Sequence, residues 1–214
     1  MNSETEQIRK ALTTKGSAPS EPVSALLRSI ARGAYRPAAF FHPLGFVYVP
    51  LLRRPEWSLR LHLWSSDGPR TPLTTSPYHM HTWDLISYVH AGRLANELVE
   101  VAADRQRPEY RVFDIFGDGS QSTLQPTDQL VRARVSGTEE VGAGEIYGMP
   151  AERYHTTLDV GREPLITVAL MTYVPGTRER TLGPLTGAAH VVPRHPCSGG
   201  ELISAVDSAL AVRS

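Results

Sequence analysis

Nine short runs rich in β-branched and aromatic residues follow one another from residue 38 to residue 174, separated by Pro, Gly and Asp. Runs of this length with this punctuation are typical of antiparallel strands joined by turns. So many in one stretch favour an all-β barrel or a double-sheet jelly roll. We expect strands at 44–52, 57–64, 78–90, 94–101, 109–116, 129–135, 145–149, 153–159 and 164–174.

The region before these runs ends in a helical pattern. Residues 1–19 are polar and finish with Gly and Pro, which indicates a frayed or weakly helical lead. From Ser20, which could cap a helix, apolar residues recur at helical spacing until Gly33. We therefore expect residues 1–37 to form a polar lead and one helix outside the β region.

The region after the last run contains a second helical stretch. Pro and Gly recur between residues 175 and 196 and disfavour long regular elements there. A helix is expected from about Gly200, with Ser198 as its N-cap. The chain then divides into a β domain over 38–176 and a tail with a helix over 177–214.

Charge and cysteine content narrow the class of partner and the compartment. The 22 basic and 22 acidic residues balance, so nothing argues for a nucleic-acid partner or an anionic membrane surface. Apolar stretches are too short for a membrane span, and the polar N-terminal residues lack the pattern of a secretory signal. The one cysteine, Cys197, excludes an intramolecular disulfide. We expect a cytoplasmic protein with a small-molecule partner, and two-fold association into a homodimer stays open.

A histidine pair gives the first indication of chemistry. His79 and His81 are two residues apart in an expected strand, so their side chains project from the same face. Both imidazoles could then bind one divalent transition metal, with a third ligand from another strand. Taken alone, the pair is equally well explained by exposed or core histidines.

A second pattern supplies the third histidine. Gly144, Pro150 and His155 have the spacing of the second cupin motif, although Glu152 stands where that motif has another Gly. The segment therefore resembles the cupin superfamily at three of the four positions that define the motif.

The segment around the histidine pair resembles the first cupin motif. His79, His81 and Gly92 take their places in it, whereas Leu73 replaces the opening Gly and Leu85 stands where the motif has Glu. The resemblance implies an all-β cupin fold, a jelly-roll barrel with flanking N- and C-terminal helices. It also implies a metal held by three histidines without the usual glutamate.

Asp84 is an alternative fourth ligand, because it is the residue next to the missing glutamate. His81 and Asp84 differ in parity, so a regular strand sends them to opposite faces. Ligation by Asp84 would need a β-bulge between them.

A narrower resemblance covers residues 57–175, which are similar to the cysteine dioxygenase-like cupins in the order of their strands and histidines. It implies Fe(II), dioxygen chemistry and a tyrosine near the metal at Tyr173. The family's relay has His and Ser where this chain has Met171 and Ala169, and its crosslinking Cys is replaced by Ile86. These departures argue against cysteine as the substrate.

Two further residues are candidates for binding a substrate. Arg60 alternates with leucines in the run 57–64, and one face of that strand must line the barrel. If the polar face does so, Arg60 could bind a substrate carboxylate; if the leucines do, Arg60 meets solvent. Trp83 shares the face of His79 and His81 and is expected to pack beneath the site.

Taken together with what the resemblance implies, these patterns favour a mononuclear non-heme Fe(II) oxygenase. Three neutral histidines leave the charge of the metal uncancelled, so a small anionic metabolite that chelates the metal is the expected substrate. Tyr173 could act as an acid, a base or a hydrogen-bond donor, or could be a wall residue. A metal-dependent lyase or isomerase and a non-catalytic ligand-binding cupin are the alternatives, as is a divalent transition metal other than iron.

Overall fold

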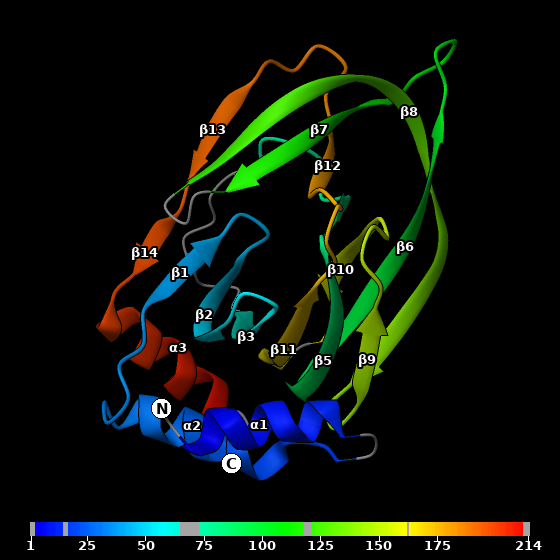
Figure 1. Ribbon diagram of the computed structural model, residues 1–214. Coiled ribbons are helices and arrows are strands. Elements are labelled where there is room, and N and C mark those ends of the chain that lie inside the picture. Colours follow the sequence, from blue (N-terminus) through cyan, green and yellow to red (C-terminus); the bar gives the residue numbers. More distant parts are fainter. Residues whose placement is uncertain (1–2, 15–16, 65–72, 118–120, 162, 212–214) are drawn as a thin grey trace.

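The computed structural model describes residues 3–14, 17–64, 73–117, 121–161 and 163–211. Within these ranges the chain forms two seven-stranded antiparallel sheets and three helices (Figure 1). The prediction of an all-β architecture with flanking N- and C-terminal helices is confirmed.

The first sheet, sheet A, has the strand order β14-β1-β2-β3-β11-β5-β9. Its strands are β1 (Ala39–His42), β2 (Phe46–Arg53), β3 (Trp57–Trp64), β5 (Trp83–Ala91), β9 (Ile146–Met149), β11 (Leu165–Tyr173) and β14 (His195–Cys197). β3 has the bounds that the sequence predicts, because its strict alternation and the turn residues around it fix both its register and its length.

The second sheet, sheet B, has the order β13-β8-β6-β10-β4-β12-β7, and β8 also pairs with β7. Its strands are β4 (His79–Met80), β6 (Arg93–Ala103), β7 (Tyr110–Gly117), β8 (Gln121–Gly142), β10 (His155–Asp159), β12 (Arg180–Gly183) and β13 (His190–Pro193). β8 pairs with β7 up to Val131 and with β6 from Val131 onward, so this 22-residue strand arches over the molecule (Figure 1).

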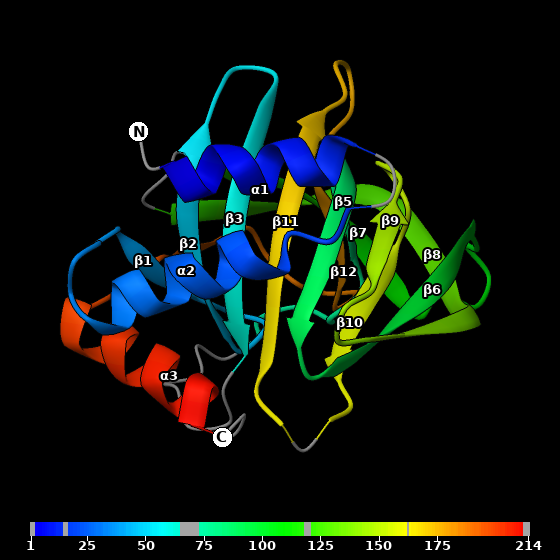
Figure 2. The ribbon, with the colours of Figure 1, turned by 90° about the horizontal axis from the view of Figure 1, so that it is seen from below.

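The helices α1 (Ser3–Thr13), α2 (Ser20–Ala31) and α3 (Gly199–Ala211) cover the outer face of sheet A (Figure 2). Their apolar sides share one buried cluster with the outward side chains of the sheet, including Ile8, Leu27, Leu61 and Val206. The expectation of a frayed or weakly helical lead is wrong for α1. A polar helix this short is marginally stable on its own, and the burial of Ile8 and Leu12 against the rest of the molecule stabilises it.

The ends of the helices only partly follow the sequence. Ser198 caps α3 as predicted: its Oγ accepts a hydrogen bond from the Glu201 N–H (3.3 Å), and Glu201 accepts one from the Ser198 N–H (2.7 Å). Ser20 does not cap α2, which begins at Ser20 itself after Pro19 and has no side-chain cap. None of the described helices is both long and apolar enough to cross a membrane.

The Pro- and Gly-rich tail contributes to both sheets, contrary to the expectation that it would hold little regular structure. β12 and β13 join sheet B, and β14 joins sheet A beside β1. A side chain on Gly183 or Gly187 would lie within 2.7 Å of the Phe113 ring, so these glycines allow the tail to pack against β7. The division at residue 176 stays a prediction, but strands of the tail belong to the same two sheets.

Candidate metal centre

The structure brings His79, His81 and His155 together. His79 on β4 is directly opposite His155 on β10, and His81 follows just beyond the end of β4. One potential ligand nitrogen from each ring lies within 4.8 Å of the others. The expected strand at 78–90 is interrupted after Met80, and this break lets the chain pass from sheet B into sheet A while it keeps His81 beside His79.

A left-handed turn ties the two histidine segments together. Glu152, which replaces a motif glycine, has φ +61°, a conformation that favours glycine. Its N–H donates a hydrogen bond to the carbonyl oxygen of His81 (2.9 Å). The substitution therefore keeps the backbone shape of the motif, and that shape places the start of β10 against His81.

The structure also explains why the first motif has a glycine at Gly92. Its φ is +75°, and a Cβ at this position would lie 2.8 Å from the Cα of Leu165. A side chain here would push β11 away from the turn after β5.

Backbone carbonyls orient two of the three rings. Nδ1 of His79 donates to the carbonyl oxygen of Pro77 (2.8 Å), and Nδ1 of His155 donates to that of Arg153 (2.9 Å). A carbonyl can only accept, so each Nδ1 carries the proton and each Nε2 keeps its lone pair. Such outer hydrogen bonds are characteristic of metal-binding histidines.

The three rings are neutral under ordinary conditions. Burial lowers the pKa of His155 to about 3 and that of His79 below its usual value. Burial, followed by the charges of His79 and His155, holds the pKa of His81 well below its usual range. Neutral imidazole is the form that binds metal, and three such nitrogens suit a divalent first-row transition metal. The residues present therefore fit the expected metal.

Asp84 is held away from this group. Its side chain is exposed and accepts a hydrogen bond from the Ala151 N–H (2.8 Å). Trp83 is buried and Asp84 points outward, as the alternation of β5 requires. Leu85, at the position of the motif's glutamate, lines the cavity instead.

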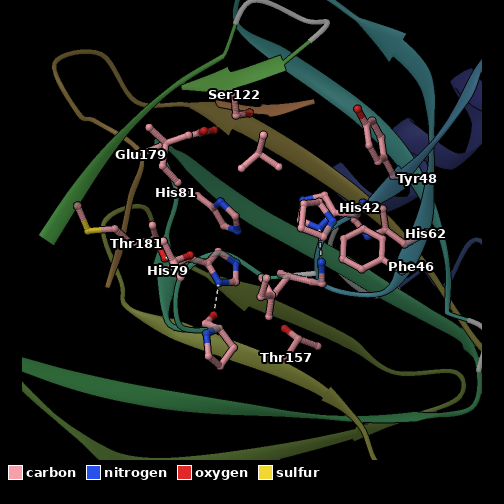
Figure 3. A pocket seen from close by; sticks show the side chains of 18 of the residues that line it. His42, Phe46, Tyr48, His62, His79, His81, Ser122, Thr157, Glu179 and Thr181 are labelled. Atoms are coloured by element: carbon pink, nitrogen blue, oxygen red, sulfur yellow. Dashed lines mark hydrogen bonds between the residues drawn. The ribbon is translucent and has the colours of Figure 1, made fainter. Parts of the chain in front are cut away.

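A cavity of about 240 Å³ lies between the sheets beside the three histidines. Figure 3 shows His79 and His81 on one side and His42 and His62 on the other. The strands of sheet A supply this opposite wall. Described residues of that wall include Phe41, His42, Phe46, Tyr48, Arg60, His62 and Trp64.

Arg60 faces the cavity. Its guanidinium lies over the rings of Tyr48 (5.5 Å) and Trp83 (5.6 Å), while Leu59 and Leu61 pack beneath the helices. Of the two orientations that the sequence allows for β3, the one with the polar face inward is therefore present. Burial lowers the pKa of Arg60, although a guanidinium stays charged.

Trp83 and Tyr173 lie in succession behind His81. The Trp83 ring is stacked on His81 at 4.4 Å and meets Tyr173 edge-on at 6.0 Å. The Tyr173 hydroxyl shares a hydrogen bond with Ser58 (3.2 Å), and Tyr173 is not among the described residues that line the cavity. The catalytic role assigned to Tyr173 stays a prediction. Arg60 lies near both phenols, and Tyr48 is the one of the two that lines the cavity.

Several wall residues escaped the sequence analysis. The sequence offers no local signal for His42, yet it lines the cavity, as do Glu179 and Arg194. Burial raises the pKa of Glu179, while the charges of Arg60 and Arg194 oppose that rise. His62 could have been found, because it shares the face of Arg60 on β3; the others come from separate segments without a local motif.

The sequence matches no protein-family model and none of the curated proteins with which it was compared. Several solved structures resemble the fold. The polyketide cyclase RemF from Streptomyces resistomycificus is 18% identical, with 68% of this chain and 74% of that chain covered and a TM-score of 0.37. The cupin domain of Schizosaccharomyces pombe Cnp3 is 7% identical, with 60% and 61% covered and a TM-score of 0.33.

A hydroquinone 1,2-dioxygenase from Sphingomonas sp. TTNP3 is 12% identical, with 58% of this chain and 64% of that chain covered and a TM-score of 0.33. These low TM-scores assign no function to this chain. The narrower likeness to cysteine dioxygenase-like cupins has no support among these structures and stays a prediction. What defines the protein is its class: an all-β chain of two antiparallel sheets with a three-histidine group facing the cavity between them.

Proposed function

We propose that the protein is a mononuclear metal-dependent oxygenase that uses Fe(II) and dioxygen on a small anionic metabolite. The observation that carries the proposal is the convergence of three neutral imidazoles, His79, His81 and His155, at the wall of a cavity that also contains the guanidinium of Arg60. In this proposal the metal is chelated by the substrate, and the cationic wall attracts the substrate's negative charge.

His79, His81 and His155 would hold the metal, which would supply open coordination positions and a redox-active Lewis acid. The carbonyl oxygens of Pro77 and Arg153 orient the rings of His79 and His155 and leave each Nε2 free to bind. Because Leu85 replaces a carboxylate ligand, the protein leaves the positive charge of the site uncancelled. The site therefore favours a ligand that brings negative charge with it.

The rest of the cavity selects for size and charge. Arg60 and Arg194 both lie near Tyr48, and the Arg194 guanidinium also donates to the Tyr48 hydroxyl (3.1 Å). Aromatic rings such as Phe46 and Trp64 form an apolar part of the same wall. A cavity of about 240 Å³ admits a small metabolite rather than a polymer.

A metal-dependent lyase or isomerase is the second candidate. It is favoured by Glu179, a carboxyl group in the cavity that can exchange protons without being part of the three-histidine group. His62 lies in the same cavity and is a hydrogen-bonding group rather than a proton carrier. Burial, followed by the charge of Arg60, lowers the pKa of His62 to about 3, so it is a neutral group near pH 7.

Oxygen uptake separates the two candidates. Protein loaded anaerobically with Fe(II) would be mixed with small thiols, 2-hydroxy acids and 1,3-diketones, and dissolved oxygen followed by electrode. The proposal expects oxygen consumption with at least one compound, abolished in His155→Ala and retained in His195→Ala, whose side chain is exposed on β14. Substrate turnover without oxygen uptake would favour the lyase or isomerase. Metal binding without turnover in any class would favour a binding protein.

A further inference from the structure

His42 is held rigidly in the wall that faces the metal-binding histidines. It is the last residue of β1, and its ring is stacked on Phe46 with centroids 4.3 Å apart and planes 9° from parallel. Tyr48 meets it edge-on at 6.0 Å. Figure 3 shows His42 across the cavity from His79 and His81.

The backbone fixes which nitrogen of His42 carries the proton. The N–H of Leu44 donates a hydrogen bond to His42 Nδ1 (3.2 Å). A backbone N–H can only donate, so Nδ1 holds a lone pair. Burial, followed by the charge of His79, holds the pKa of this ring well below its usual range. A neutral imidazole with a lone pair on Nδ1 carries its hydrogen on Nε2.

This arrangement is the reverse of that at the metal-binding residues. In His79 and His155 the carbonyl partners place the hydrogen on Nδ1 and leave Nε2 as a lone pair. In His42 the amide partner leaves Nε2 as a donor at the tip of the ring. His42 is therefore unsuited to be a further metal ligand as it stands, but suited to donate a hydrogen bond into the cavity.

We infer that His42 is a substrate-binding residue whose Nε2–H donates a hydrogen bond to an acceptor atom of the molecule bound between it and the three histidines. The inference rests on the proposed function and narrows its substrate class. The substrate presents an anionic or carbonyl acceptor to this wall rather than an ammonium group. The charged neighbours agree with this, because Arg60 and Arg194 lie near His42. Glu179 is a half-buried carboxyl group on which the charges of both arginines act.

The test uses acetohydroxamate, an anionic chelator with two oxygen atoms, as the probe. Wild-type protein and the variants His42→Phe, His42→Gln and His195→Phe would be loaded with Co(II), and the probe titrated while the visible absorption of the metal is followed. Phe keeps the stacking on Phe46 but removes the donor, whereas Gln returns an N–H near the place of Nε2. His195 belongs to β14, which pairs with β1, but its side chain is exposed.

All four proteins are expected to bind Co(II). The dissociation constant of the probe should rise about tenfold in His42→Phe, the loss of one charge-assisted hydrogen bond. It should stay within about threefold of wild type in His42→Gln and be unchanged in His195→Phe. Equal probe affinity in wild type and His42→Phe would overturn the role of His42 alone. Failure of wild type to bind Co(II) would overturn the proposed function and this inference with it.

A measurement on the wild-type protein needs no variant to fold. Long-range proton–nitrogen correlation spectra of the Zn(II)-loaded protein, labelled with ¹⁵N-histidine, distinguish the two tautomers. His42 is expected as the Nε2–H form, and His79 and His155 as Nδ1–H forms. An Nδ1–H signal for His42 would contradict the inference.

Discussion

The two faces of β3 differ in the chemistry of their side chains and in what those side chains contact. Leu59, Leu61 and Leu63 point outward and are buried beneath the three helices, whereas Arg60 and His62 point inward to the cavity. Successive side chains of a strand alternate between faces, so one eight-residue segment contributes to the core and to the site at once. The difference shows that the residues of the apolar core and those of the candidate site alternate along the same strand. They do not belong to separate domains.

The separation extends over the whole of sheet A. Its outer face is continuous with the helices in one apolar cluster, and its inner face carries histidines, arginines and aromatic rings around a cavity. We therefore expect substitutions on the outer face to leave the site intact, and substitutions on the inner face to leave the apolar cluster intact. Each of the following experiments tests one side of this division.

The largest effect on stability is expected from Leu61→Ala on the outer face. Leu61 is completely buried, and truncating such a leucine leaves a cavity that costs about 2–5 kcal/mol of unfolding free energy. Urea unfolding followed by circular dichroism measures the loss. Metal affinity should not change. A loss of stability well below this range, or a loss of metal from the folded variant, would break the division between the faces.

A decrease in pH is expected to have an intermediate effect on the free energy of unfolding, through His62 on the inner face. The pKa of His62 is about 3 in the folded chain and near 6.5 when unfolded, so unfolding takes up a proton between these pH values. Stability is full above pH 6.5 and falls as the pH decreases towards 3. Between pH 7.5 and 5.5 the wild type should lose about 1.4 kcal/mol through this residue, in addition to the share of the other buried histidines.

The variant His62→Phe should lose about 1.4 kcal/mol less than wild type over the same pH interval. Denaturant midpoints at the two pH values measure the difference. His195→Phe, which changes an exposed histidine, serves as the control and should follow the wild type. An identical acid dependence in wild type and His62→Phe would show that His62 is not buried in the neutral form.

The smallest effect is expected at the start of α3, the helix that closes one edge of the outer face. Ser198→Ala removes the hydroxyl that accepts the Glu201 N–H and should cost about 1 kcal/mol. Ser204→Ala, at an exposed position inside α3, should be nearly neutral or slightly stabilising. Thermal unfolding of the two variants side by side gives the comparison, and equal melting temperatures would exclude the cap.

The sequence predicted the elements whose signal is local. The alternation of β3, the histidines of the two motifs and the cap at Ser198 are each contained in a few neighbouring residues. The same alternation indicated that Asp84 would turn away from His81, and it does. Periodicity, spacing and capping act over short distances, so they can be recognised without knowing what lies across the fold.

What the sequence did not predict depends on contacts between distant segments. α1 is stabilised by burial against the rest of the molecule, and the tail strands by pairing with β1, β7 and β8. His42 reaches the cavity because β1 lies opposite the three histidines, and the contact of Tyr173 with Trp83 joins two strands that are far apart in the sequence and meet only in the folded chain. The sequence alone also left open which face of β3 lines the cavity. The structure decides this, because the leucines of β3 pack against the helices.

The most direct test of the central claim is the metal content of the folded protein. Wild type, Leu61→Ala, His79→Ala, His81→Ala and His155→Ala would be purified without oxygen, equilibrated with Fe(II), dialysed and analysed by mass spectrometry of the metal. We expect about one iron per chain in wild type and in Leu61→Ala, and almost none in the three histidine variants. Full retention of iron in any folded histidine variant would contradict the three-histidine site.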